Sequence, residues 1–401
     1  MPGDADPLML HAPYFAIAAP GLEPVLTTEL TALGLRAQAT PGGAGFHGDL
    51  RELYEANLRS RVASRVLVRV AAFRATAFYE LEKRARRVPW ERFLPAGGAV
   101  AFRITARASR LYHEGAIEER LLEAVARVGG APAPATLDEE EGERAQVFVV
   151  RVVRDHFVIS ADASGALLHR RGYRQAVAKA PLRETMAAAM LMASGWDLHS
   201  PLVDPFCGSG TIPIEAALMA RRIPPGLASP GLEPRRFAFQ HWADFDPVLW
   251  ASVVERAQEG VQAAAPGPIL ALDRDAGAIA ATRSNARRAD VLVDLDTGMR
   301  PLSTLEAPAG PGWLVTNPPY GKRVGEASPL RDLYATLGRV ARERLPGWKL
   351  AFLSADRRLE AQVWLKLREI LRTTNGGLPV RLMVARVPLE PVDARTDGGS
   401  S

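Results

Sequence analysis

Three short apolar runs, each ending at a polar residue and followed by a segment with helical spacing, constrain the fold of this chain most strongly. They cover residues 201–203, 269–272 and 313–316, and the polar residues that follow them are Asp204, Asp273 and Asn317. Alternation of helices with such runs is typical of a parallel α/β sheet. Ligands bind these sheets at the carboxyl ends of the strands, so the three polar residues should line one site.

The first run leads into a glycine-rich turn, Asp204-Pro205-Phe206-Cys207-Gly208-Ser209-Gly210-Thr211. Gly208 and Gly210 permit a tight turn whose backbone lies close to a ligand, where a Cβ would clash. Residues 211–220 favour a helix whose first turn tolerates Pro213. This strand–turn–helix unit is typical of nucleotide sites in doubly wound folds, although neither the dinucleotide fingerprint nor the P-loop spacing is present. The alternative is a purely structural turn.

The second run ends at Asp273, where a carboxylate can accept hydrogen bonds from both hydroxyls of a ribose. Asp275 is the competing candidate for this role. It lies two residues later, just before a segment with helical spacing, and we expect it to start that helix. We therefore place Asp273, with Arg274 beside it, in the ligand site.

The third run leads into Asn317-Pro318-Pro319-Tyr320, a sequence suited to holding a planar NH₂ group. The lone pair of an exocyclic base amine is delocalised into the ring, which makes it a poor nucleophile. The Asn317 side-chain oxygen and the Pro318 carbonyl can each accept one N–H and so favour a pyramidal nitrogen. Pro318 and Pro319 fix φ and hold that carbonyl in place. Tyr320 offers a face on which a base can stack. The alternative is a proline-rich turn.

These motifs, in this order, resemble the class I methyltransferases that use S-adenosylmethionine to methylate exocyclic amines of nucleobases. The continuation Gly321-Lys322-Arg323 narrows the resemblance to the RNA guanine-N2 methyltransferases that carry a THUMP domain. Residues 180–185, 14–34 and 102–120 also resemble segments of this family, so the resemblance covers roughly residues 12 to 390. The bacterial large-subunit ribosomal RNA enzymes are the most similar group, followed by tRNA guanine-N2 methyltransferases.

The resemblance implies a set of site residues. Catalytic roles fall on Asn317, Pro318, Pro319 and Tyr320, and S-adenosylmethionine would be bound by Asp204, Phe206, Gly208, Ser209, Gly210, Thr211, Asp273, Arg274 and Asn317. One position departs from the family pattern. An acidic residue is expected near the cofactor adenine, and a gapless reading puts Met299 there. Asp294 or Asp296 could take that place only if the strand were shifted, and recognition by backbone alone is the other alternative.

The expected fold is α/β, a C-terminal Rossmann-like class I methyltransferase domain preceded by an α+β N-terminal region with a THUMP domain. The expected divisions are a ferredoxin-like subdomain at 1–55, the THUMP domain at 56–165, a linker at 166–180, the methyltransferase domain at 181–390 and a disordered tail at 391–401. A hairpin is predicted at 147–161. The proline-rich insert at 222–246 is long for a connection and could be a lid, an RNA contact or a structural elaboration.

Composition limits the remaining classes. The 401 residues predict two or three domains, and no run of 18 apolar residues is present to form a transmembrane helix. The polar N-terminus is unlike a signal peptide, so we expect a cytoplasmic protein, and a monomer. The single cysteine, Cys207, excludes an intrachain disulfide and a cysteine-cluster metal site. The histidines lack metal-ligand spacing, and we expect no metal.

A net charge of +5 permits an RNA partner without requiring one. The residues expected to contact RNA are Arg107, Arg110, Arg170, Arg171, Arg174, Lys179, Lys322 and Arg323. For the cluster at 170–179, phosphate contact and a structural role are equally consistent with the sequence. The cluster at 83–87 favours a solvated helix face.

RNA guanine-N2 methylation accounts for every feature above, with ribosomal RNA favoured over tRNA as substrate. The alternatives are methylation of another amine, either adenine N6 or a protein glutamine, and a non-catalytic RNA-binding factor. The THUMP-like half argues against a DNA or protein substrate. The complete Asn317–Tyr320 motif argues against a non-catalytic factor, because a scaffold has no need of amine acceptors.

Overall fold

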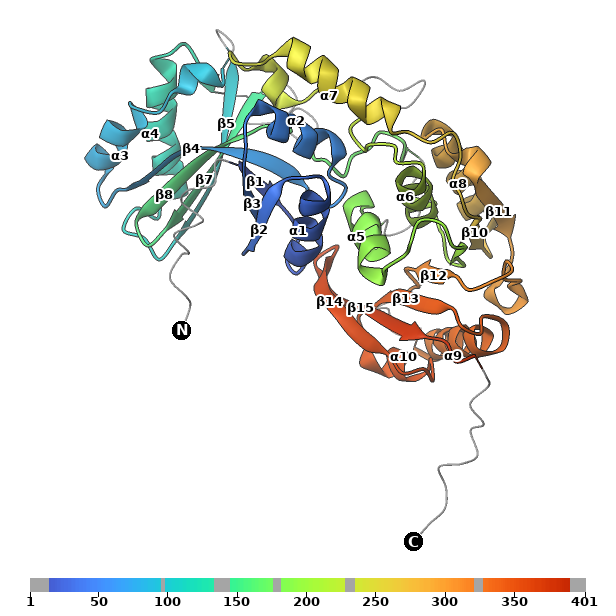
Figure 1. Ribbon diagram of the computed structural model, residues 1–401. Helices are drawn as coiled ribbons and strands as arrows, with labels where there is room; N and C mark the ends of the chain where they lie inside the picture. The colour runs from blue at the N-terminus through green and yellow to red at the C-terminus, as the bar shows by residue number, and fades with distance from the viewer. Residues whose placement is uncertain are drawn as a thin grey trace.

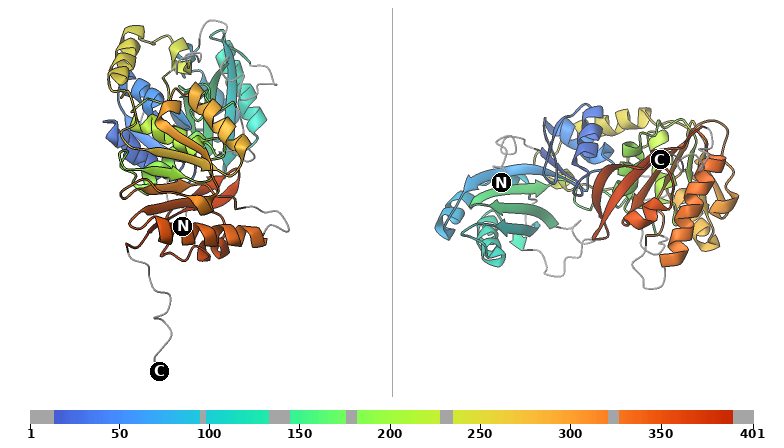
Figure 2. Two further views of the ribbon diagram at one scale, coloured as in Figure 1. Left: turned by 90° about the vertical axis from the view of Figure 1, so that its right-hand side faces the viewer. Right: turned by 90° about the horizontal axis from the view of Figure 1, so that it is seen from below.

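The computed structural model describes residues 14–94, 98–132, 145–175, 182–227, 235–320 and 327–389. Two sheets organise this part of the chain, one of eight strands in the N-terminal half and one of seven in the C-terminal half. Figure 1 shows the two halves side by side, and Figure 2 shows the same arrangement from the side and from below. The tail expected at 391–401 lies outside the described residues.

The N-terminal sheet has the strand order β2-β3-β1-β4-β8-β7-β5-β6. Its strands are β1 (Tyr14–Ile17), β2 (Arg36–Thr40), β3 (Gly43–His47), β4 (Arg65–Arg74), β5 (Ala99–Arg107), β6 (Ala131–Pro132), β7 (Ala145–Val153) and β8 (His156–Asp162). The helices are α1 (Glu23–Ala32), α2 (Leu50–Arg59), α3 (Phe78–Ala85) and α4 (Glu114–Ala126). The β7–β8 hairpin confirms the hairpin predicted from the sequence.

One long strand, β4, makes the N-terminal half continuous. Its beginning pairs with β1, and its remainder pairs with β8, so the first strands and the later ones belong to a single sheet. The ferredoxin-like subdomain and the THUMP region expected from the sequence therefore share a hydrogen-bonded ladder. Residue 55, the expected end of the first subdomain, falls inside α2.

The C-terminal sheet has the order β11-β10-β9-β12-β13-β15-β14. Its strands are β9 (Leu202–Asp204), β10 (Ile269–Asp273), β11 (Leu295–Met299), β12 (Trp313–Thr316), β13 (Lys349–Ser354), β14 (Arg368–Asn375) and β15 (Leu378–Arg386). The helices are α5 (Glu184–Ser194), α6 (Thr211–Ala220), α7 (Pro247–Glu259), α8 (Ala276–Arg288), α9 (Ala327–Arg344) and α10 (Arg357–Ala361). The five neighbouring strands β11, β10, β9, β12 and β13 are parallel to one another. Strand β15 is antiparallel to β13. The expected Rossmann-like class I fold is confirmed.

Helices α5 and α6 link the C-terminal sheet to the N-terminal half. Every residue of α6 is buried, and α5 is buried along most of its length. A helix that is apolar on all sides has neighbours on all sides, which explains the absence of a polar stripe in these two segments. Figure 1 shows both helices between the C-terminal strands and α1.

A buried polar cluster fixes how the halves meet. The Glu29 carboxylate accepts hydrogen bonds from Ser60 Oγ at 2.8 Å and from the Arg61 backbone N–H at 2.6 Å. The Arg61 guanidinium donates to the carbonyls of Leu218, in α6, and Ile223, at 3.1 and 2.7 Å. Because α6 starts at the glycine-rich turn, the N-terminal half directly supports the helix that carries that turn.

Residues 235–246, the second of two described parts of the insert, belong to the core between the halves. Phe239 stacks on Tyr54 with ring centroids 4.6 Å apart, and the indole N–H of Trp242 donates to Gln146 Oε1 at 2.7 Å. All three aromatic rings are buried. Of the three roles open from the sequence, this part of the insert therefore has the structural one.

No described helix is long and apolar enough to cross a membrane.

Candidate active site

The glycine-rich turn between β9 and α6 has the backbone that only glycine adopts easily. Gly208 and Gly210 have φ of 56° and 87°, in the left-handed region. A Cβ at Gly210 would come within 2.8 Å of Thr282 Cγ2. The buried side chains of Thr282 and Asn285, on α8, hold the turn by donating to the carbonyls of Gly208 and Ser209, each at 2.9 Å. Ser209 and Thr211 are buried in the turn, and Phe206 is half-buried.

Asp273 lies at the carboxyl end of β10 and faces this turn. Its Oδ2 accepts the Gly208 N–H at 3.0 Å, and its Oδ1 accepts the Asp275 N–H at 3.0 Å. Asp275 caps α8 by accepting the Gly277 N–H, which confirms the prediction that it starts the helix. Arg274 is exposed between them. Each oxygen of the half-buried Asp273 carboxylate has a second lone pair, so the group can still accept from a ligand.

Asp204 joins the first and third motifs. Its buried carboxylate accepts Thr316 Oγ1 at 2.5 Å and the Phe206 N–H at 3.1 Å. Burial raises the pKa of Asp204 to about 7, against the lowering effect of these two hydrogen bonds. The bond to Thr316 fixes the end of β12 beside the glycine-rich turn. Burial also raises the pKa of the neighbouring Cys207 thiol, which disfavours the thiolate that a nucleophilic cysteine needs.

Asn317 follows β12 at the same edge of the sheet. Its Oδ1 is buried and has no hydrogen-bond donor among the described residues. Buried acceptors are nearly always paired in proteins, so an unpaired one at a strand end marks a place for a ligand donor. Pro318 is buried and Pro319 exposed. The structure thus brings Asp204, Asp273 and Asn317 to one sheet edge, as the sequence predicts.

Tyr320 has a partner that sequence reasoning missed. Asn375, the last residue of β14, donates its Nδ2–H to the Tyr320 hydroxyl at 2.7 Å. The ring is half-buried, and burial raises the pKa of its hydroxyl. In the sequence, Asn375 stands before Gly376-Gly377, a pattern that indicates a turn and no side-chain partner. No local signal connects it with residue 320, because the contact depends on how the hairpin packs.

The register of β11 settles the position of Met299. This exposed residue pairs with Asp273 across the parallel ladder, at the carboxyl end of the strand. Asp296 pairs with Leu270 in mid-strand. Asp294 lies before the strand, where it accepts the Ala265 N–H at 2.8 Å. The strand therefore ends with Met299 beside Asp273, whereas Asp294 and Asp296 lie away from this edge.

Two of the residues expected to contact RNA pair with buried carboxylates of the protein itself. The Arg171 side chain is only 3% exposed and lies 3.5 Å from the buried Glu215 carboxylate, and Arg174 pairs with the buried Glu184 at 3.0 Å. Both arginines therefore neutralise carboxylates inside the junction of the halves. Burial raises the pKa of Glu184 to about 7 despite the Arg174 charge.

The other expected RNA contacts are divided between surface and undescribed positions. Arg107 and Arg110 are exposed at the end of β5 and just after it, and Arg170 is half-buried. Lys179, Lys322 and Arg323 lie outside the described residues. Within the described ranges, no cluster of three or more His, Cys, Asp or Glu side chains could hold a metal ion.

Class I methyltransferases share with other Rossmann-like folds a glycine-rich turn after one parallel strand, here β9, and an acidic residue at the end of the next, here β10. Residues 171–380 match the RMKL-like methyltransferase domain, and residues 13–67 match the RlmL ferredoxin-like domain. The chain belongs to this RlmL-like methyltransferase family, which confirms the family expected from the sequence.

Curated relatives match nearly the whole chain. The protein slr0064 of Synechocystis sp., which carries a provisional RNA methyltransferase name, is 34% identical over 92% of this chain and 96% of its own. The ribosomal RNA large subunit methyltransferase K/L of Syntrophotalea carbinolica is 37% identical over 92% of this chain and 53% of that protein. The K/L protein of Marinobacter nauticus is 33% identical. The chain thus spans about half the length of the two K/L proteins.

Solved structures of methyltransferases superpose on nearly the whole chain. SMU.472, solved as a methyltransferase complex with SAH, superposes with a TM-score of 0.82 at 29% identity, over 93% of this chain and 97% of that one. A Clostridium difficile methylase superposes with a TM-score of 0.83 at 27% identity, over 95% and 99%. TrmN from Thermus thermophilus, at 20% identity and a TM-score of 0.68, shares the fold.

Proposed function

We propose that this protein transfers a methyl group from S-adenosylmethionine to the exocyclic N2 amine of a guanosine in RNA, with large-subunit ribosomal RNA as the favoured substrate. The observation that carries the proposal is the buried Asn317 Oδ1, which has no donor among the described residues, at the sheet edge that also bears the glycine-rich turn. An amine N–H of the substrate would supply the missing donor. The names of the slr0064 and K/L relatives support an RNA substrate, and K/L supports ribosomal RNA.

The described residues fit S-adenosylmethionine. When bound, this cofactor supplies an electrophilic methyl group. Gly208 and Gly210 keep the turn free of Cβ atoms, so its backbone can approach a ligand closely. The Asp273 carboxylate retains acceptor capacity for two ribose hydroxyls. Phe206, Ser209, Thr211, Asp204 and Arg274 complete the proposed pocket, and the SAH complex of SMU.472 supports this ligand.

The catalytic residues act by holding the amine. Asn317 Oδ1 and the Pro318 carbonyl each accept one amine N–H, which draws the nitrogen out of conjugation and exposes its lone pair. The two prolines keep that carbonyl fixed. Tyr320 supports the base ring, and its hydroxyl is held by Asn375. After transfer, the surplus proton leaves to water, so the site needs no strong general base.

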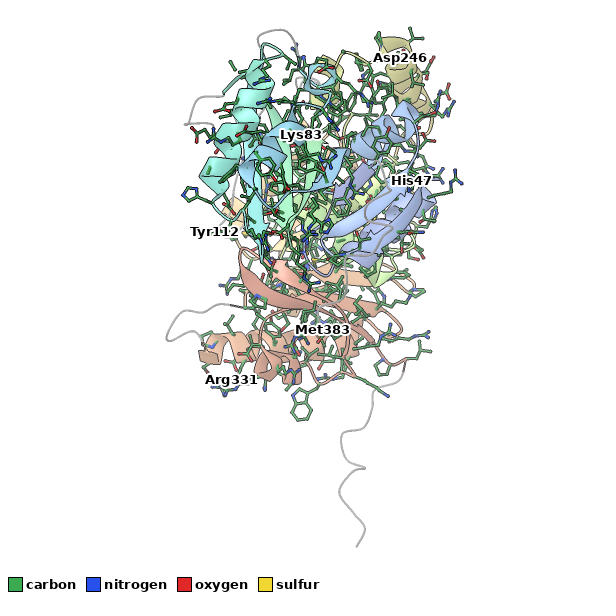
Figure 3. The ribbon with its side chains drawn as sticks, turned by 90° about the vertical axis from the view of Figure 1, so that its left-hand side faces the viewer. His47, Lys83, Tyr112, Asp246, Arg331 and Met383 are labelled. Carbon is green, nitrogen blue, oxygen red and sulfur yellow. The ribbon has the colours of Figure 1, made fainter. Side chains whose placement is uncertain are left out.

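The N-terminal half is proposed to dock the RNA. Arg107 and Arg110 expose their guanidinium groups at one end of β5, near Tyr112, whose ring is 74% exposed. Figure 3 shows Tyr112 and Lys83 on the N-terminal half, above the C-terminal half, which carries Arg331 and Met383. Basic side chains beside an exposed aromatic ring suit phosphates and unpaired bases.

One experiment separates the candidate substrates. The purified protein is incubated with radiolabelled S-adenosylmethionine and total RNA from cells that lack its gene, and the labelled nucleosides are identified. N2-methylguanosine in large-subunit rRNA is expected, with label appearing about 10²–10³-fold more slowly from Asn317→Ala. Label in tRNA would replace rRNA as the substrate. Label in N6-methyladenosine would favour adenine, in line with the name of a 30% identical Listeria monocytogenes protein of known structure, an N6-adenine-specific DNA methylase. No label would contradict catalysis.

A further inference from the structure

A tryptophan stands out on the C-terminal half because nothing in the fold requires it. The indole of Trp364 is 75% exposed, and its backbone has φ of 54°, in the left-handed region. Bulky residues rarely adopt this conformation, which costs about 1–3 kcal/mol. Neither burial of the ring nor local backbone preference therefore explains a tryptophan at this position.

The loop that carries Trp364 is firmly held. The Arg342 guanidinium, on α9, donates to the carbonyls of Val363 at 2.7 Å and Trp364 at 3.0 Å. The helix also touches the loop at Gly338, where a Cβ would come within 1.8 Å of the Val363 oxygen. Val363 is fully buried, and Leu365 packs against the core. The ring thus projects from a rigid base.

Four exposed cationic side chains lie within seven residues of Trp364 along the chain. Arg357, Arg358, Lys366 and Arg368 are exposed, and none makes a hydrogen bond or ion pair through its side chain to the described residues. The nearby carboxylates are already engaged. Asp356 caps α10, Glu360 pairs with Arg381 at 2.7 Å and Glu369 pairs with Arg372 at 3.1 Å. We refer to Trp364 with these four cations as the Trp364 patch.

We propose that the Trp364 patch binds an unpaired segment of RNA, with one base stacked on the indole and the flanking phosphates against Arg357, Arg358, Lys366 and Arg368. A π-face surrounded by unpaired cations complements single-stranded RNA. A protein partner is less suited, because Trp364 is the only exposed large apolar side chain between residues 350 and 380, all of which the structure describes. A protein interface needs a wider apolar centre.

The patch would act as a second RNA contact, separate from the N-terminal half. Figure 1 shows α9 and α10 on the side of the C-terminal sheet that faces away from that half. The identity of the RNA rests on the proposed function, whereas binding by the patch can be measured without methyl transfer.

The test uses the full-length protein and a fluorescently labelled single-stranded RNA of about eight nucleotides. Fluorescence anisotropy should show Trp364→Ala weakening binding by about 5- to 150-fold, the equivalent of one lost stacked base, while Trp364→Phe stays close to wild type. Val293→Ala, at a site 89% exposed, is the matched control and should change nothing. In the double variant Arg357→Ala/Arg358→Ala, the slope of log binding constant against log salt concentration should become shallower by about 0.7 for each lost phosphate contact. Circular dichroism melts verify folding.

Three results would overturn the inference. One is equal affinity of wild type and Trp364→Ala for the single strand. Another is an equal loss of affinity of Trp364→Ala for a blunt-ended RNA duplex, which offers no unstacked base. The third is a wild-type dimer in light scattering that Trp364→Ala converts to a monomer, since the patch would then join two protein copies. Failure of methyl transfer to any RNA, with binding still dependent on Trp364, would contradict the proposed function alone.

Discussion

The hydrogen bond from Asn375 to Tyr320 gives the sharpest test of how the site is positioned. Asn375 lies at the tip of the β14–β15 hairpin, far along the chain from the ring that it orients. Asn375→Ala leaves the tyrosine in place but removes its one described partner. Tyr320→Phe removes the same bond from the other side. The two variants should therefore behave alike, and the double variant should be no worse than either.

The expected decrease in kcat follows from the geometry of this hydrogen bond. The bond is 2.7 Å long and partly buried, and such a bond contributes about 0.5–1.5 kcal/mol net. If the bond serves to hold the ring for the substrate base, each variant should lower kcat by about 2- to 13-fold. Thr374→Ala is the control, because that neighbouring side chain is exposed. Asn375 is a positioning residue, so the affinity for S-adenosylmethionine should not change.

Single-turnover kinetics on the native RNA, with calorimetry for the cofactor, measure both quantities. A fully additive double variant would show that the two residues act independently. An Asn375→Ala protein with wild-type kcat, beside a slow Tyr320→Phe, would show that the hydroxyl has a role apart from this bond. Either result would refute positioning by Asn375.

Three further predictions address the same site. Asn317→Ala should lower the single-turnover rate by about 10²–10³-fold with cofactor affinity unchanged in calorimetry, because one of two amine acceptors is lost; a near wild-type rate would contradict the assigned role. Asp273→Ala should weaken S-adenosylmethionine binding by about 10- to 150-fold in a folded protein, and unchanged affinity would remove Asp273 from the pocket. The pKa of Asp204 is raised by burial to about 7, so the folded state binds more protons than the unfolded state between about pH 4 and 7. The free energy of unfolding of the wild type should therefore fall relative to Asp204→Asn as the pH rises through that range, and parallel urea denaturation profiles would contradict it.

Those parts of the site that depend on neighbouring residues in the chain were predictable. Two glycines in a strand–helix turn, and a carboxylate directly after an apolar run, report local backbone requirements. The carboxyl-edge rule then brings Asp204, Asp273 and Asn317 together without any knowledge of packing. The β11 register, which keeps Met299 beside Asp273, follows from an uninterrupted strand.

The remainder depends on tertiary contacts that a sequence does not mark. Thr282 and Asn285 on α8 hold the glycine-rich turn by hydrogen bonds. The helical spacing of that segment predicts the helix but not these contacts. Arg171 and Arg174 belong to a basic run that looks the same whether it faces RNA or buried carboxylates. Their partners, Glu215 and Glu184, lie in helical segments that read as apolar, and nothing in those segments shows which cation each carboxylate meets.

The hydrogen bonds from Arg61 to the end of α6 have a consequence for target selection. They lock the helix that begins at the glycine-rich turn onto the N-terminal half, so the methyl-transfer edge and the proposed docking surface keep a constant separation. The distance between these two surfaces would then limit which nucleotide of a bound RNA can reach the site. If the protein acts on RNA as proposed, it would choose its target nucleotide by the span between that nucleotide and a distant docking element of the RNA. Lengthening the intervening RNA by a few base pairs would then move the methyl group to a different nucleotide.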